Sequence, residues 1–311
     1  MTGTGARRIV LDCDPGHDDA MAILLAAASP ALELVAITTV AGNQTLDKVT
    51  LNARRVCSVA GISEVPIAAG CERPMRRRQV VAGDIHGASG LDGVEWDEPT
   101  VGVDPRHGVD VIIESAGAGP LTLIAVGPLT NVATALERAP DIAPNIERIS
   151  IMGGAIGLGN RTPSAEFNIY VDPEAAAAVF RSGIPITLVP LEVTHQALAT
   201  DAVLDRIGAL GSPVAKMSVA LMRFFAETYE RVFGMTAPAV HDPCAVAALI
   251  QPSIVRTRLV NVSIDTTSGI SAGRTACDIH GVTGEPPNAE IALDLDVPAF
   301  WDLMIEALAA Y

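Results

Sequence analysis

Short β-branched runs alternate with helix-forming segments along this chain, and that alternation limits its fold more than any other feature. Strand and helix patterns at this spacing form βαβ units, which build a mostly parallel sheet with helices on both faces. We therefore predict an α/β fold in a single domain over residues 1–311: an open, mostly parallel, Rossmann-like sheet flanked by helices. The predicted strands are 9–11, 34–40, 66–68, 121–126, 149–152 and 185–189, and helices are predicted at 20–28 and 46–60.

Polar residues gather where the predicted strands end. In sheets of this class, ligands bind outside the carboxyl ends of the strands, so we expect the active site there. Helices are also predicted over 201–233, with a break at 211–213, and over 245–250, with Asp242 at the capping position. Thr130 or Asn131 is expected to cap the helix after strand 121–126. The polar groups at strand ends are the segment 14–19, Asn43, Gly127, Gly153 and Glu192.

The overall charge excludes one class of partner. The formal net charge is −15, so a polyanion such as nucleic acid would be repelled. The one basic run, 73–78, is interpreted as a solvated loop, and the surrounding segment 70–105 as a long active-site loop or a small subdomain. The chain lacks a signal-peptide pattern and an apolar stretch of membrane-spanning length. Its odd number of cysteines shows no CxxC spacing. We expect a cytoplasmic protein with no membrane partner.

The segment 12–19 carries four carboxylates directly after the first predicted strand. Anions packed so closely repel one another and resist ionising. A divalent cation would resolve that conflict, and carboxylate oxygens suit Ca²⁺ or Mg²⁺. Helix capping accounts for one or two of these aspartates and leaves the others unexplained. Asp12 is the member most consistent with a structural role, because it lies within the strand.

Three further polar segments carry little weight individually. His241-Asp242 at a helix start is explained by capping, Glu166-Phe167-Asn168 by a polar loop, and Asp84-Ile85-His86-Gly87 by a turn. Phe225 and Tyr229 lie four apart on a predicted helix, where core packing is the ordinary interpretation. For Phe225 that interpretation stays open against a pocket role, whereas Tyr229 is expected to face a binding pocket.

Together with the acidic cluster, these segments resemble a known family. Asp14-Pro15-Gly16-His17-Asp18-Asp19 resembles the N-terminal signature of the nucleoside hydrolases, the inosine-uridine-preferring family. The later motifs of that family follow in the same order, from residue 9 to about 250. They are Val40-Ala41-Gly42-Asn43, Ile85-His86-Gly87, Val126-Gly127-Pro128-Leu129-Thr130-Asn131, Met152-Gly153-Gly154, Glu166-Phe167-Asn168 and His241-Asp242-Pro243.

The resemblance implies Ca²⁺-dependent hydrolysis of the N-glycosidic bond of ribonucleosides, of pyrimidine or inosine type, to free base and ribose. It implies Asp14 as the base that activates a metal-bound water and His241 as the acid or hydrogen-bond donor to the departing base. The implied metal ligands are Asp14, Asp19, Asp242 and the carbonyl of Val126. The implied substrate-binding residues are Asp18, Asn43, His86, Met152, Asn160, Glu166, Phe167, Asn168 and Tyr229. It also implies a homodimer or homotetramer.

The expected chemistry agrees with those residue types. Cleavage passes through a ribosyl cation, which neighbouring carboxylates would stabilise. No residue is placed as a covalent nucleophile, so direct attack by water is predicted. Neither Trp96 nor Trp301 falls in a matching motif, which disfavours the purine-specific subclass. Two alternatives stay open: a phosphatase that uses Asp12-Cys13-Asp14 as a DxD motif, and a non-catalytic nucleoside-binding protein on the same fold.

Overall fold

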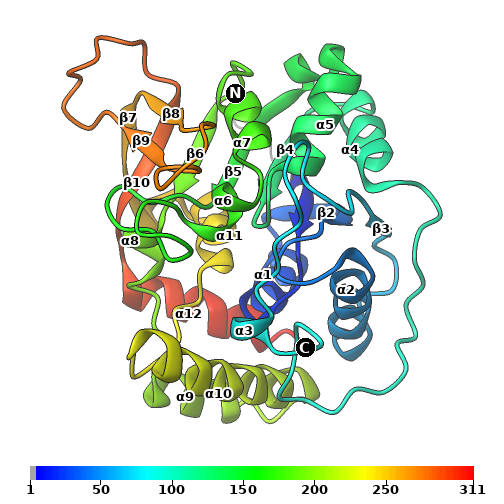
Figure 1. Ribbon diagram of the computed structural model, residues 1–311. Helices are drawn as coiled ribbons and strands as arrows, with labels where there is room; N and C mark the ends of the chain where they lie inside the picture. The colour runs from blue at the N-terminus through cyan, green and yellow to red at the C-terminus, as the bar shows by residue number, and fades with distance from the viewer. Residues whose placement is uncertain (1–4) are drawn as a thin grey trace.

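The computed structural model describes residues 5–311, and its centre is an eight-stranded sheet in the order β3-β2-β1-β4-β5-β6-β10-β7 (Figure 1). Neighbouring strands are parallel except for β7, which is antiparallel to β10. The predicted α/β fold class is thereby confirmed. The strands of this sheet are β1 (Arg7–Cys13), β2 (Leu32–Thr39), β3 (Ile67–Ala69), β4 (Leu121–Ala125), β5 (Ile146–Met152), β6 (Ile186–Val189), β7 (Val255–Val260) and β10 (Ala289–Leu295). A separate hairpin pairs β8 (Val262–Ile264) with β9 (Thr275–Cys277).

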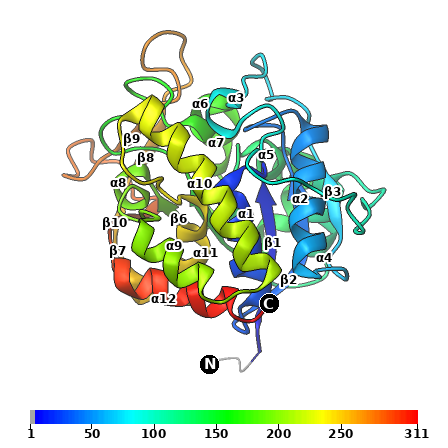
Figure 2. The ribbon, with the colours of Figure 1, turned by 90° about the horizontal axis from the view of Figure 1, so that it is seen from below.

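Helices cover both faces of the sheet. The residues of β1 alternate between two apolar clusters: Ile9 and Leu11 join one and Val10 joins the other. Both faces of a parallel strand are buried in this way when helices lie on each side. The first cluster is covered by α1, α2 and α9 to α12, of which α9, α10 and α12 lie in front in Figure 2, and the second by α4, α5 and α7.

Helices occur along the whole of the described chain. None of the helices in residues 5–311 is both long and apolar enough to cross a membrane. The α-helices are α1 (His17–Ala28), α2 (Leu46–Ala60), α3 (Gly83–His86), α4 (Gly108–Gly117), α5 (Thr130–Arg138), α6 (Phe167–Val171), α7 (Pro173–Phe180), α8 (Leu191–Thr194), α9 (Asp201–Gly208), α10 (Pro213–Phe233), α11 (Asp242–Ile250) and α12 (Val297–Leu308). Two 3₁₀ turns, η1 (Pro140–Asn145) and η2 (Pro252–Ile254), precede β5 and β7.

Two predicted helix caps are wrong. Helix α11 already includes Asp242, and the capping position belongs to His241, whose side chain makes no cap hydrogen bond. At α5 the capping position is Leu129. The Thr130 hydroxyl instead donates to Asp172 at 2.7 Å, and the Asn131 amide donates to Asp12 at 2.7 Å. At α5, distant polar partners take the side chains that local spacing assigns to the helix terminus.

The segment 70–105 is a long loop with one helical turn, α3, and not a subdomain with a sheet of its own. Its basic run is solvated only in part. Arg73, Arg76 and Arg78 are exposed, whereas Arg77 pairs with Glu174 of α7 at 2.9 Å. That ion pair fastens the loop to the α7 side of the sheet, and the loop then continues into α3 at the mouth of the pocket described below.

The order of the strands reverses between β1 and β4. From β1 the chain runs outward to β2 and β3, and it then returns to the other side of β1 as β4. A crevice forms at such a reversal, outside the carboxyl ends of the two strands. Asp14 follows β1 and Val126 follows β4, so the fold brings both predicted ligands to that crevice.

Candidate active site

The acidic cluster lies at the carboxyl end of β1, where it meets the start of α11 from far along the chain. Asp18, Asp19 and Asp242 each offer a carboxylate oxygen, and these oxygens lie within 4.8 Å of one another. Asp19 accepts backbone N–H groups from Asp14 at 3.0 Å and Gly16 at 2.9 Å, which closes the turn into α1. Asp18 accepts the backbone N–H of His241 at 3.2 Å. These bonds fix the carboxylates relative to both helices.

Asp14 is fully buried, and its two carboxylate oxygens differ in their hydrogen bonding. Oδ2 accepts the backbone N–H of Asn43 at 2.6 Å, whereas Oδ1 has no hydrogen-bond partner within residues 5–311. Glycines line this carboxylate: a Cβ at Gly42 would overlap Oδ2, and one at Gly127 would lie 2.5 Å from Oδ1. Both strand-end motifs therefore need glycine to let the backbone approach Asp14.

The environment of the cluster disfavours negative charge. Burial raises the pKa of Asp14 and of Asp242 well above the ordinary value, and neighbouring carboxylates raise both further. Burial also raises the pKa of Asp18 to about 7. Desolvation and like charges both penalise an ionised carboxyl, and a nearby cation removes the penalty.

The donor set fits a hard divalent cation. It consists of carboxylate oxygens, including Oδ1 of Asp14, and the backbone carbonyl of Val126. That carbonyl accepts one hydrogen bond, from Asn168 at 2.8 Å, and a carbonyl oxygen has a second lone pair. Oxygen donors of these kinds suit Ca²⁺ better than metals that prefer nitrogen or sulfur ligands.

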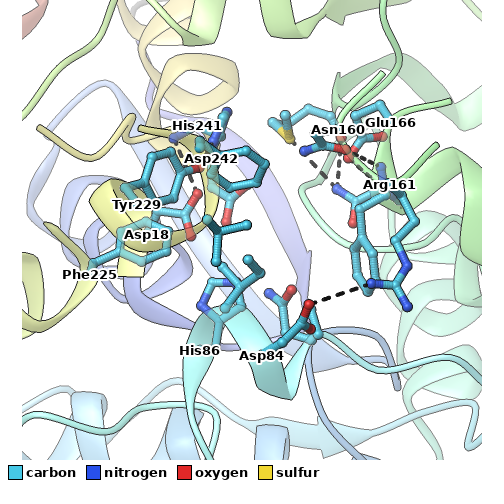
Figure 3. A pocket seen from close by; sticks show the side chains of 18 of the residues that line it. Asp18, Asp84, His86, Asn160, Arg161, Glu166, Phe225, Tyr229, His241 and Asp242 are labelled. Atoms are coloured by element: carbon cyan, nitrogen blue, oxygen red, sulfur yellow. Dashed lines mark hydrogen bonds and ion pairs between the residues drawn. The ribbon is translucent and has the colours of Figure 1, made fainter. Parts of the chain in front are cut away.

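A pocket opens beside the cluster, and Figure 3 shows the side chains around it. The structure brings together at its walls most of the residues that the sequence proposes for the site. Asp14 and Asp19 are fully buried and are not among the lining residues. The proposed residues that line the pocket are Asp18, Asn43, His86, Val126, Met152, Asn160, Glu166, Phe167, Asn168, Tyr229, His241 and Asp242.

One wall of the pocket is built from the loop after β5 and the start of α6. Glu166 caps α6: it accepts the N–H of Asn168 at 2.8 Å, and it also accepts the N–H of Gly154 at 2.9 Å. Burial raises the pKa of Glu166 to about 7. Asn160 accepts the N–H of Phe167 through Oδ1 at 2.9 Å. These backbone bonds set the orientation of the polar wall.

Glu166→Gln is expected to flatten the pH dependence of stability. The folded-state pKa of Glu166, about 7, exceeds its ordinary value of 4.5, so the folded state holds this proton more tightly. The resulting stability is full below the ordinary value and is lost as the pH rises to about 7, with a slope of up to about 1.4 kcal/mol per pH unit. Urea unfolding of both proteins across that range measures the difference. If the unfolding free energies of the two proteins changed with pH in parallel, the raised pKa of Glu166 would be contradicted.

The opposite wall holds His241 with both ring nitrogens engaged. Nε2 lies 2.5 Å from the Tyr229 hydroxyl, and Nδ1 lies 2.7 Å from the Thr194 hydroxyl. Burial lowers the pKa of His241 to about 3, so the imidazole is neutral near pH 7. The Tyr229 hydroxyl therefore lies next to the imidazole in the pocket wall. Sequence reasoning missed Thr194, because a threonine after a strand carries no signal of such a contact.

Aromatic rings form the floor beside this wall. Phe225 is 1% exposed, stacks on His17 and His86 at centroid distances of 5.0 and 5.2 Å, and meets Tyr229 edge-on at 4.6 Å. It is thus both a core residue and a pocket residue, so the two interpretations of Phe225 do not exclude each other. His17 was missed as a support: its Nδ1 lies 3.1 Å from Nδ1 of His86.

The pocket is also lined by two charged residues, Arg161 and Asp84, that the sequence did not propose as site residues. Arg161 of the β5–α6 loop reaches Asp84 of α3 at 3.8 Å, as Figure 3 shows. The two side chains are 33% and 60% exposed, and pairs of this kind contribute about 0–1 kcal/mol. Isolated charged loop residues are ordinary, so no pattern distinguished them. The other lining residues outside the sequence proposals are Ala82, Ile85, Val232 and Phe233.

The sequence and the structure of this chain are similar to those of known proteins. The sequence model described as inosine-uridine preferring nucleoside hydrolase matches residues 9–302. Proteins of Shigella sonnei (strain Ss046) and Escherichia coli (strain K12), each named pyrimidine-specific ribonucleoside hydrolase RihB, are 44% identical to this chain over 307 residues, 98% of either sequence. The solved structure of a purine-preferring ribonucleoside hydrolase from Gardnerella vaginalis matches with a TM-score of 0.91 and 32% identity, covering 97% of this chain and 98% of its own. Because these matches span almost the whole chain, it belongs to the inosine-uridine preferring nucleoside hydrolase family and is a ribonucleoside hydrolase.

Proposed function

We propose that this enzyme is a Ca²⁺-dependent hydrolase of pyrimidine or inosine ribonucleosides that releases free base and ribose by direct attack of water. One observation carries the proposal: a buried set of carboxylates lies against a pocket with amides on one side and His241 on the other, and one oxygen of Asp14 has no hydrogen-bond partner among residues 5–311. The names of the 44% identical relatives support a pyrimidine base.

Asp14, Asp19, Asp242 and the Val126 carbonyl would hold the cation. When bound, Ca²⁺ would offset the carboxylate charge, bind the vicinal hydroxyls of ribose and make a nearby water more acidic. Three polar side chains that line the pocket beside the acidic cluster, Asp18, Asn43 and Asn168, would orient the 2′- and 3′-hydroxyls. Positioning of the sugar and the water in one cavity converts their encounter into an effectively unimolecular step.

Asp14 would accept the proton of the attacking water. Oδ2 is held by Asn43, so the carboxylate is fixed in direction, and Oδ1, without a hydrogen-bond partner in residues 5–311, has one lone pair for the cation and a second for the proton. As the bond to the base breaks, the sugar becomes cationic, and the surrounding carboxylates stabilise that charge. Ca²⁺ acidifies water less than Zn²⁺ does, which is why a positioned base is required.

The leaving base would meet the Tyr229–His241–Thr194 chain of hydrogen bonds. A neutral His241 bonded to Tyr229 does not provide an imidazolium, so we propose that His241 acts on the base through the Tyr229 hydroxyl. The Thr194 hydroxyl fixes the ring from behind. In this arrangement the Thr194 hydroxyl would donate to Nδ1 and the Nε2–H of His241 would donate to the Tyr229 oxygen, which leaves the one phenol proton to donate to a developing anion on the base.

His241→Ala is expected to slow uridine hydrolysis by roughly 10²-fold or more, which is the usual contribution of a positioned proton donor. Hydrolysis of p-nitrophenyl riboside should fall much less, because its leaving group departs without protonation. Tyr229→Phe should show the same selectivity. Steady-state kinetics on both substrates measure it, and equal losses on the two would remove this chain of residues from leaving-group activation.

A substrate panel tests the function itself. The purified protein is incubated separately with uridine, cytidine, inosine and p-nitrophenyl phosphate, and free base, reducing sugar and phosphate are measured. Release of base together with ribose supports the proposal. Phosphate release would indicate the phosphatase alternative, and nucleoside binding without turnover would indicate a non-catalytic binding protein.

A further inference from the structure

The single helical turn α8 contacts both walls of the pocket. It follows β6 directly, and its Leu191 N–H donates to the carbonyl of Gly154 at 3.1 Å. Thr194, at its end, holds His241 on one wall. Glu192, in its first turn, holds the loop that builds the other wall. Nothing in the function above uses Glu192, which the sequence indicates only as one polar residue at a strand end.

Glu192 binds two consecutive backbone N–H groups. Oε2 accepts from Ile156 at 3.0 Å, and Oε1 accepts from Gly157 at 2.7 Å. One carboxylate oxygen serves each donor, which fixes the direction of the loop as well as its position. Three residues after Gly157 comes Asn160, one of the pocket-lining amides. The carboxylate therefore anchors the loop close to a side chain that faces the ligand.

Over residues 157–161, the other contacts of this loop are weaker, lie within it or join it to α6. Leu158 is 79% exposed, and Arg161 joins Asp84 only through the pair at 3.8 Å. On its C-terminal side, Asn160 accepts the N–H of Phe167. Loop segments with few buried contacts and exposed backbone are those that shift most readily. Removal of Glu192 would leave the loop tied at Gly154 and at α6, and it would free the backbone of Ile156 and Gly157 between those points.

We propose that Glu192 is a positioning residue that places Asn160 for recognition of the 5′-hydroxyl of the ligand. The proposal rests on the function proposed above, in which the ribose lies against the acidic cluster. The base is then directed to the wall of Tyr229 and His241, and the 5′ end to the opposite wall, where Asn160 and Glu166 lie (Figure 3). Glu192 does not line the pocket, so it acts through the loop and not by contact with the ligand.

The test compares uridine with 5′-deoxyuridine. For Glu192→Ala, kcat/KM for uridine is expected to fall about tenfold or more, mainly through KM, which corresponds to the loss of a charge-assisted hydrogen bond. For 5′-deoxyuridine, which lacks the recognised hydroxyl, kcat/KM should stay within about twofold. Glu192→Gln keeps one acceptor oxygen and should lie between. Glu306→Ala, an exposed glutamate on α12, is the matched control and should change neither substrate.

A double-mutant cycle with Asn160→Ala sharpens the assignment. If Glu192 acts through Asn160, adding Glu192→Ala to Asn160→Ala causes no further loss of discrimination between the two substrates. Equal losses on uridine and 5′-deoxyuridine, or additive effects in the cycle, would overturn the proposal. So would a wild-type enzyme that does not distinguish the two substrates. Failure of the wild-type enzyme to hydrolyse either nucleoside would instead overturn the proposed function.

Discussion

Asp14→Asn is expected to abolish most turnover while leaving the fold intact. Loss of a positioned general base costs roughly 10²–10⁴-fold in rate, and loss of a ligand charge weakens cation binding in addition. Asparagine is isosteric, and its carbonyl oxygen can still accept the Asn43 N–H that Asp14 accepts at 2.6 Å. Steady-state kinetics with uridine at saturating Ca²⁺ measure the loss.

The same variant should not be destabilised in the absence of metal. Burial and the neighbouring carboxylates disfavour the charge of Asp14, so its removal relieves repulsion. We expect the melting temperature of Asp14→Asn in EDTA to equal or exceed that of the wild type. A variant that loses both activity and stability would show only that the residue is needed for folding, and near-normal activity would refute the assignment of Asp14.

Asp12→Asn is the matched control, because Asp12 is also a fully buried carboxyl, two residues earlier on β1. It accepts hydrogen bonds from Thr38 at 2.6 Å and from Asn131 at 2.7 Å and does not line the pocket. This substitution should leave kcat within about tenfold of wild type, since it changes a buried hydrogen-bonded strand residue and not the base. The contrast between the two variants separates chemistry from folding.

Removal of the cation is expected to abolish activity and to lower the melting temperature. A ligand that binds only the folded state stabilises it by about 2.7 kcal/mol at a hundredfold excess over Kd, which corresponds to a shift of about 4 °C for a chain of this length. Differential scanning fluorimetry in EDTA, and again after Ca²⁺ is restored, measures the shift. Mg²⁺ should restore less, because its octahedral geometry tolerates fewer protein ligands.

The effect of chelation should depend on pH. In the metal-free protein the pKa of Asp18, about 7, exceeds the ordinary 3.8, so the folded state binds more protons than the unfolded state. Stability of the metal-free protein therefore falls as the pH rises between those values, and the shift on adding Ca²⁺ should be larger at about pH 8 than at about pH 5. Elemental analysis shows whether the protein is free of metal. If metal-free protein were fully active and had an unchanged melting temperature, the proposed cation site would be contradicted.

The sequence predicted the fold class because local patterns encode it. The spacing of apolar runs places strands and helices, and helix α2 begins and ends at the predicted residues, 46 and 60. Other boundaries shift by a few residues, as for β1, where 9–11 was predicted and Arg7–Cys13 is observed. The C-terminal region, which carried no assignment, forms β10 and α12. Its strand pairs with β6 and β7, and that pairing depends on distant segments.

By itself, the sequence determined which residue types reach the ends of the strands, and the order of those motifs carried the family resemblance. Only the tertiary structure decided how the side chains are used: His241 is held by two hydroxyls, Glu166 caps a helix, and one oxygen of Asp14 has no partner in the part of the chain that the structure describes. The physical reason is the range of the forces involved. Periodicity and propensity act over a few residues, whereas the bond from His241 to Asp18 joins positions 223 apart and forms only once the sheet and its helices have packed.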